Sequence, residues 1–495
     1  MFSKKLIATL IGIFLLASQI WAAQVLTFDK FVQTTVQNHP QYQVAVKEYL
    51  AAIEANKSAN SLEDWNLIAS TFLNEASPAP ISTFSSTYQK TLGYSVGTEK
   101  YFAGTGTGLK IEHSNTRINA EYPPAMAIPG VGTFDFNPPP TYYISDLSIS
   151  ISQPLLRNAF GLITKKSLLI SDYSLLLAQI KLSEDWEDFI AKLRNEYLAW
   201  QECHINVKLY EEKVKTAEEQ LDLVKRQAKY GLSEDLDLVQ TKQKVEAYKI
   251  MLEQAKMACL SQDQKIISLM NITGGSKNDI APEAFNATIP TMGKANALDY
   301  LTNNSNIRQT TDLMVAIQTQ NLEIVNNQQL MDLNLVLQAK PNGFADKAAD
   351  SLTNIGEYND YTISLSASRP LANEKANADG RKANEEYEKA LKQKEAALLS
   401  AKTALATLYT NLDFLTKIID RSEASLKLAE QRLALEKKKF RQGRSSVFFV
   451  LQAEDDLLQA TNQLNSVLFS REKIVNQIKS MSDEYLVEYK DILKI

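Results

Sequence analysis

Residues 230–235 read Tyr-Gly-Leu-Ser-Glu-Asp, and they interrupt a long stretch that contains almost no other helix breaker. No glycine or proline lies between Gly161 and Gly231, and apolar residues recur there at three- and four-residue steps. Gly231 can adopt the left-handed conformation that ends a helix, and Ser233 can cap the helix that follows. The stretch therefore predicts two long antiparallel helices joined by a tight turn.

The residues after this turn form a heptad pattern. Heptads sustained over this length indicate helices that pack side by side, as in a coiled coil. With a rise of about 1.5 Å per residue, a helix of roughly 70 residues reaches about 100 Å, which an ordinary globular domain does not need. We therefore expect the hairpin to be a strut or the wall of a tube. The heptad positions are Leu238, Val245, Leu252, Cys259 and Ile266.

The same design returns in the second half of the chain. Residues 441–446 read Arg-Gln-Gly-Arg-Ser-Ser, and residues 374–482 contain two glycines and no proline. Gly443 follows Gly231 by 212 residues, and several residues on either side are identical at that offset. We therefore predict a structural repeat. Its parts are a first repeat at 24–275, a linker at 276–295, a second repeat at 296–482 and a C-terminal tail at 483–495.

Segments with two-residue alternation precede each helical hairpin. Leu147–Ser152 and Tyr361–Leu371 alternate apolar residues with serine or threonine, and Gly108–Asn119 and Leu330–Gln338 offer partner strands. Strands with one apolar and one polar face, joined by loops such as residues 120–140, fit a membrane barrel, with a soluble half-buried sheet as the alternative. Four strands are too few to close a pore, so several chains must contribute.

Other segments complete each predicted repeat. Short helices are expected at Phe28–Asn60 and Ala297–Asn327. The first half carries about fifty extra residues, mostly between Asn74 and Thr141, by comparison of the two halves. An additional strand is possible there at Tyr88–Tyr101, followed by a turn at Ala103–Gly106. The sequence assigns no role to this insertion.

The N-terminus has the pattern of a cleavable secretory signal. A positive start at Lys4–Lys5 precedes the apolar run Leu6–Ala17, and the small pair Ala22–Ala23 follows. We predict a signal peptide at residues 1–23, with a retained anchor as the alternative. After it, no run of about eighteen apolar residues occurs, so no membrane helix is expected.

The two cysteines lie at equal distances from the first turn. Cys203 and Cys259 stand 28 residues before and after Gly231, so the antiparallel hairpin places them at similar heights. In an oxidising compartment they could pair, but only Cys259 lies on the heptad seam. A disulfide is therefore possible but is not predicted, and two unbridged, half-buried thiols are the alternative.

The composition argues against an enzyme and against a nucleic-acid-binding protein. The three histidines lie in separate elements, none at metal-ligand spacing, and no nucleophile elbow or phosphate loop is present. The net charge is −5, with both signs interspersed. We expect no catalytic, cofactor or metal site and no nucleic-acid partner.

Several motifs together resemble the TolC-like outer-membrane efflux proteins. They are the opening Leu26-Thr27-Phe28 with Asn38-His39-Pro40, the stretch Ser-Gln-Pro-Leu-Leu-Arg-Asn at 152–158, and the two turns in which lysine or arginine precedes Gly-x-Ser. They occur in the expected order between about residues 26 and 482.

This resemblance implies an α+β membrane protein that forms a homotrimer. Four strands per protomer would form a shared twelve-stranded β-barrel in outer-membrane lipid, and the coiled-coil hairpins would form a periplasmic α-barrel. The implied function is the outer-membrane channel of a tripartite efflux or type I secretion system, located in the cell outer membrane and extending into the periplasm. The implied partners are a periplasmic adaptor and an inner-membrane transporter, while the exported substrate and the transporter class stay open.

By the same resemblance, the two turns form the closed periplasmic tip that contacts the adaptor. Well-studied members carry acidic side chains six and nine residues after the second turn glycine, where this chain has Phe449 and Gln452. We hypothesise a tip closed by apolar contacts, with packing between helices as the alternative role of the phenylalanines. The tip residues are Gly231, Ser233, Gly443 and Ser445, and the gate candidates are Asp237, Val447, Phe448, Phe449 and Gln452.

A soluble periplasmic coiled-coil adaptor or scaffold is the rival interpretation. It explains the signal peptide and the long hairpins but does not explain the paired strands with one serine-rich face.

Overall fold

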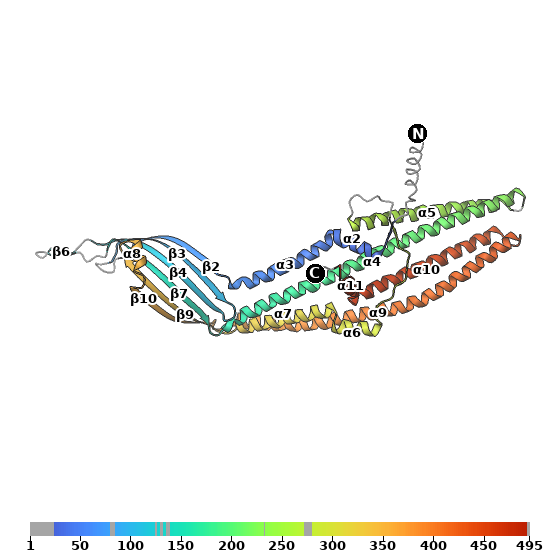
Figure 1. Ribbon diagram of the computed structural model, residues 1–495. Coiled ribbons are helices and arrows are strands. Elements are labelled where there is room, and N and C mark those ends of the chain that lie inside the picture. The colour runs from blue at the N-terminus through green and yellow to red at the C-terminus, as the bar shows by residue number, and fades with distance from the viewer. Residues whose placement is uncertain are drawn as a thin grey trace, which may run out of the picture. The chain divides into compact units, whose positions relative to one another are not determined.

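The computed structural model describes residues 24–79, 85–123, 126–128, 132–134, 139–231, 233–271 and 280–492. The predicted signal peptide and residues 276–279 of the predicted linker lie outside this part. The chain divides into two compact units, each formed by separate stretches. The first unit contains residues up to 49, 179–310 and 395 onward, and the second contains 50–178 and 311–394. Figure 1 shows the elements of both units.

Two pairs of long helices have the predicted hairpin order (Figure 1). Helices α4 (Leu162–Lys229) and α9 (Glu374–Arg441) each have 68 residues, and α5 (Asp235–Met270) and α10 (Val447–Met481) follow them. Gly231 and Gly443 have φ of +68° and +70° between the helices, which confirms the predicted reversals. Since no atom lies within 4 Å of a Cβ built at either glycine, backbone conformation rather than space requires glycine there.

Each predicted short helix is two helices. Helices α2 (Phe28–Asn38) and α3 (Pro40–Asn60) are separated at His39, which is extended because the ring of the following proline disfavours the helical conformation. Helices α6 (Lys294–Asn303) and α7 (Asn306–Gln328) form the second pair. Strand β1 (Gln24–Leu26) pairs in parallel with β8 (Ile280–Pro282).

Aromatic residues dominate the main core of the first unit. Trp186, Tyr197 and Trp200 of α4 are fully buried, and the Tyr197 hydroxyl donates to the Leu26 carbonyl oxygen at 2.6 Å. Residues predicted as a C-terminal tail belong to this core. Helix α11 (Glu484–Glu488) carries the buried Tyr485, and the hydroxyl of the nearby buried Tyr489 donates to Asp29 at 2.8 Å.

One antiparallel sheet of six strands lies in the second unit, which corrects the predicted four strands. The expected additional strand is present as β3, and its turn at Ala103–Gly106 leads into β4. Strand β2 was missed because its residues, Asn-Leu-Ile-Ala-Ser-Thr-Phe-Leu-Asn-Glu-Ala, do not alternate strictly. The strand order is β10 (Tyr358–Ser368), β9 (Asp332–Ala345), β7 (Thr141–Pro154), β4 (Thr107–Glu121), β3 (Tyr88–Phe102) and β2 (Asn66–Ala76).

Short elements connect these strands to one another and to the helices. They are the 3₁₀ helices η1 (Ser61–Glu63) and η2 (Ala159–Gly161), the strands β5 (Met126–Ile128) and β6 (Gly132–Phe134), and helix α8 (Ala348–Thr353). None of the helices in the part of the chain that the structure describes is both long and apolar enough to cross a membrane.

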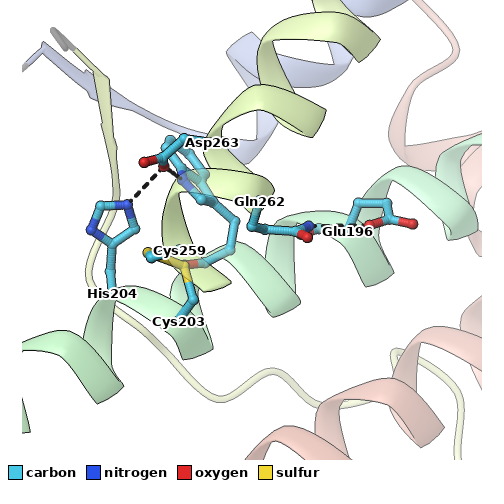
Figure 2. Close-up of a disulfide and its surroundings, with 7 residues drawn as sticks. Glu196, Cys203, His204, Cys259, Gln262 and Asp263 are labelled. Atoms are coloured by element: carbon cyan, nitrogen blue, oxygen red, sulfur yellow. Dashed lines mark hydrogen bonds and ion pairs between the residues drawn. A yellow bond between two sulfur atoms is a disulfide. The ribbon is translucent and has the colours of Figure 1, made fainter. Parts of the chain in front are cut away.

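Cys203 of α4 and Cys259 of α5 form a disulfide, with their Cα atoms 5.1 Å apart (Figure 2). The sequence did not predict this bond. It forms because the two antiparallel helices pack closely at this height, although Cys203 lies off the heptad seam. Beside it, Asp263 lies 3.1 Å from His204 Nε2 and accepts a hydrogen bond from Trp200 Nε1.

Removing the disulfide is expected to lower the unfolding free energy. The bond closes a loop with a sequence separation of 56 residues, for which chain entropy gives about 4 kcal/mol. The double variant Cys203→Ser/Cys259→Ser should show this loss in denaturant unfolding, and the reduced wild-type protein should match it. An unchanged denaturation midpoint in both proteins would show that the bond does not stabilise the hairpin.

Candidate functional site: two helix turns and a two-faced sheet

A small apolar cluster joins the two helical hairpins close to their turns. Val224 of α4 packs with Phe440, Val447 and Val450, all of them buried. One ion pair adds to this contact, since Lys244 of the first hairpin pairs with Asp455 of the second. Within the second hairpin, Lys437 Nζ lies 2.9 Å from Glu454. The structure thus brings the turns at Gly231 and Gly443 together at one end of the first unit (Figure 1).

In the first turn, Asp237 is held by its neighbours. Its Oδ2 accepts the Ser233 hydroxyl at 3.0 Å and the Glu234 N–H at 3.3 Å. The residue that caps α5 is Glu234, in a reciprocal capping box with Asp237, so Ser233 supports the cap instead of forming it. Asp237 is half-buried, and its carboxylate contributes to the N-terminus of α5.

The second turn separates the three apolar gate candidates. Val447 is 0% exposed and belongs to the apolar cluster, whereas Phe448 and Phe449 are 55% and 49% exposed. The two phenylalanine rings contact each other edge to face, with centroids 5.5 Å apart, and Gln452 is exposed one helical turn further on. Val447 therefore packs inside the protomer, and the two phenylalanines are available for contacts with other chains.

Ser445 has a different role from Ser233. Its hydroxyl donates to Glu436 Oε2 at 2.9 Å, which ties the turn back to α9. Hydrogen bonds from Lys439 and then from Ser445 hold the pKa of the Glu436 carboxyl below its usual value. The last turn of α9 is basic, as the helix dipole favours.

The strand register gives the sheet one apolar and one polar face. Directly paired residues share a face, so Leu365, Leu335 and their neighbours define a continuous apolar surface across the strands. Its large side chains are unusually exposed for a soluble protein. They include Leu67 and Leu73 of β2, Leu92, Tyr94 and Val96 of β3, Ile149 and Ile151 of β7, Leu337 of β9, and Ile363 and Leu365 of β10.

Hydroxyl and charged side chains occupy the opposite face. Gln338 Nε2 donates to the Ser148 hydroxyl at 2.8 Å, and Ser70 and Ser95 share a hydrogen bond of the same length. This face also contains Ser114, Ser150, Ser152, Ser364 and Ser366, together with Glu112 and Asp146.

A buried polar network ends the apolar face near the β9–β10 connection. Ser351 of α8 shares a hydrogen bond of 2.8 Å with Ser145, and the Asn115 amide donates to both serines. All three residues are buried, so α8 covers this end of the face. The uncovered apolar band lies between this network and the helical end of the strands.

Strands β2 and β10 form the two edges of the sheet. Each has 11 residues and pairs with one neighbour in the described part of the chain. Because the sheet is antiparallel and has six strands, its two edge strands run in opposite directions. Every residue of β10 is exposed. Both edges therefore offer free backbone groups for pairing with another strand.

Residues 335–482 match the family described as outer membrane efflux protein. Among solved structures, the chain is similar to CusC, with a TM-score of 0.67 at 11% identity over 92% of this chain and 91% of that one. It is also similar to VceC of Vibrio cholerae, with a TM-score of 0.66 at 14% identity over 92% and 96% of the two chains. It is similar as well to CmeC of Campylobacter jejuni, with a TM-score of 0.65 at 13% identity over 94% of this chain and 90% of that one.

No curated protein matches the sequence. The matched structures are those of an outer-membrane protein and of transmembrane or outer-membrane channels, and they agree with the chain along nearly its whole length. Residues 335–482 therefore resemble the outer membrane efflux protein family, and the chain has the fold of the outer-membrane channels to which it is similar.

Proposed function

We propose that this protein is the outer-membrane channel of a tripartite efflux or type I secretion system, a passive duct through the outer membrane and the periplasm. The exposed apolar face of the sheet carries this proposal. Its strands have 11 to 15 residues, and a tilted strand needs about 9–11 to span a bilayer. The polar face is suited to a water-filled lumen.

The channel is a homotrimer in which strand β2 of one copy pairs with β10 of the next. The two edges have equal length and opposite direction, so this pairing continues the antiparallel sheet with its apolar face on one side. Three six-stranded sheets give a closed barrel of eighteen strands instead of the expected twelve. Closure leaves no edge strand exposed in the membrane, where an unpaired backbone group costs several kcal/mol.

The tip at Gly231 and Gly443 contacts a periplasmic adaptor, which connects the duct to an inner-membrane transporter. The phenylalanine pair Phe448–Phe449 closes the lumen there, with Gln452 one turn behind it. Asp237 stabilises the first turn through its hydrogen bonds to Ser233 and Glu234 and is not a free acidic filter. Transport energy comes from the transporter, and the duct performs no chemistry. The exported substrate stays open.

A soluble periplasmic adaptor or scaffold is the second candidate. It is disfavoured by the apolar band, because soluble proteins rarely expose contiguous apolar patches larger than a few hundred Å².

Separation of cell fractions tests the proposal. The protein should appear with the outer membrane, and after detergent extraction its mass should equal three chains in a complex that resists dissociation until heated. Recovery as a freely soluble periplasmic monomer would establish the adaptor or scaffold instead.

A further inference from the structure

Three carboxylates from two separate parts of the first unit meet next to residues of its aromatic core. Glu184 and Glu187 lie one turn apart on α4, and Asp483 lies between α10 and α11 with φ of +53°. One oxygen atom of each lies within 4.8 Å of the others. We name these three residues the carboxylate cluster.

The cluster is buried and incompletely bonded. Glu187 is 1% exposed, and neither of its carboxylate oxygens accepts a hydrogen bond of standard geometry; its nearest polar neighbours are the Leu486 backbone N–H and the Asp483 carboxyl. Asp483 accepts the Tyr300 hydroxyl at 3.0 Å and the Asn306 N–H at 3.1 Å. The Asn306 side chain is 8% exposed, and its amide is directed at the Glu184 carboxylate.

The charged groups that act on these acids are other acids. Glu184 lies near Asp483, Asp188 and Asp185, and Glu187 lies near Asp483 and Glu184. A buried carboxylate without a compensating charge is strongly disfavoured, so the site needs a counter-charge or bound protons.

We propose that the carboxylate cluster binds one divalent cation of the calcium type. Ca²⁺ takes oxygen ligands at about 2.3–2.6 Å, so two of its ligands can be up to about 5 Å apart, which accommodates the observed spacing. The donor set consists of carboxylates, with an amide and a phenol beside them, and contains no thiol or imidazole that would favour zinc. The carboxylate oxygens of Glu187, which accept no hydrogen bond of standard geometry, supply ligands to the ion.

Such an ion ties α4 to the α10–α11 turn. Because Tyr300 and Asn306 already bond to Asp483, it also fixes the end of α6 and the start of α7. The bound cation is therefore a structural clamp of the first unit. The proposal does not depend on the function of the chain as a duct.

Terbium binding tests this inference on the purified full-length protein in detergent. Tb³⁺ occupies calcium sites, and the Tyr300 ring next to Asp483 can sensitise its luminescence. We expect saturable binding of one ion per chain that Ca²⁺ displaces, and a higher thermal midpoint with Ca²⁺ than with a chelator. Glu187→Gln and Asp483→Asn should each weaken Tb³⁺ binding at least about tenfold, as the loss of a carboxylate ligand implies.

The variants are matched to their sites. Glutamine keeps the shape of Glu187, and asparagine tolerates the left-handed backbone of Asp483. Asp185→Asn is the control, since it removes an acid next to Glu184 outside the cluster and should leave binding unchanged. The proposal is overturned if the wild type shows no saturable binding, or if Glu187→Gln binds as tightly as the wild type. The buried acids would then be neutralised by protons.

Discussion

Replacing Phe448 and Phe449 together by alanine is expected to raise the single-channel conductance of the purified protein in planar bilayers several-fold. Both rings are about half exposed in the protomer and contact each other at the first turn of α10. In the proposed trimer the rings of three copies meet across the lumen and exclude water. Alanine removes these contacts without opening the protomer core, because Val447 and Val450 form that core.

The control for this experiment is Phe414→Ala. Phe414 is 59% exposed on α9, far along the helix from the turn, so its loss removes similar apolar surface without touching the tip. Its conductance should equal that of the wild type. If the double variant also conducts like the wild type, the two phenylalanines only pack between helices and the gate lies elsewhere.

Deleting the β3–β4 hairpin, residues 88–121, is expected to narrow the outer-membrane pore and still allow assembly. Strands β2 and β4 run in the same direction, so β2 can take the place of β4 beside β7. Three four-stranded sheets then close a barrel of twelve strands. Since barrel diameter grows roughly linearly with strand number, the diameter falls to about two thirds and the open-channel conductance to roughly half.

This measurement is made in the Phe448→Ala/Phe449→Ala background, where the tip no longer limits the current. The parent double variant is the reference. If the deletion variant inserts as a trimer and has the same solute size limit as the parent, the hairpin does not determine the diameter of the lumen. Failure to form the trimer would show that β2 cannot replace β4.

The helix turns and strand β7 are predicted correctly because each depends on a local sequence pattern. Gly231 and Gly443 stand alone in long stretches without breakers, and only glycine readily adopts the positive φ found at both. The alternation of apolar residues with serine at Leu147–Ser152 predicts β7. Successive side chains of a strand point to opposite faces of the sheet, so a strand with one apolar and one polar face keeps this two-residue period. These patterns predict the helical hairpins and the two-faced strands, whereas the shared trimeric barrel is implied by the family resemblance.

Strand β2, the disulfide and the carboxylate cluster depend on tertiary contacts, which the spacing of residues in the sequence does not reveal. Strand β2 has a large aromatic residue on the polar face, where Phe72 lies against Gly93, so its alternation is masked. The disulfide requires a helix rotation that places Cys203 toward Cys259, which the heptad seam did not indicate. Glu187 and Asp483 are almost three hundred residues apart, and their meeting depends on how α11 packs.

The sequence also does not distinguish the individual gate candidates from one another. Val447, Phe448 and Phe449 are equivalent in the sequence as three consecutive apolar residues. The helix turns by about 100° at each position, so one faces the core while two face outward. Likewise, Asp237 can be read as a free acid from its position, but the turn uses its carboxylate as a cap.

Electron microscopy of the protein extracted from outer membranes reports the number of copies and the number of barrel strands in one measurement. We expect a three-fold symmetric particle in which β2 of each copy pairs with β10 of the next, in a closed barrel of eighteen strands. A monomer with both edge strands unpaired, or an assembly held together without the sheet, would contradict this expectation.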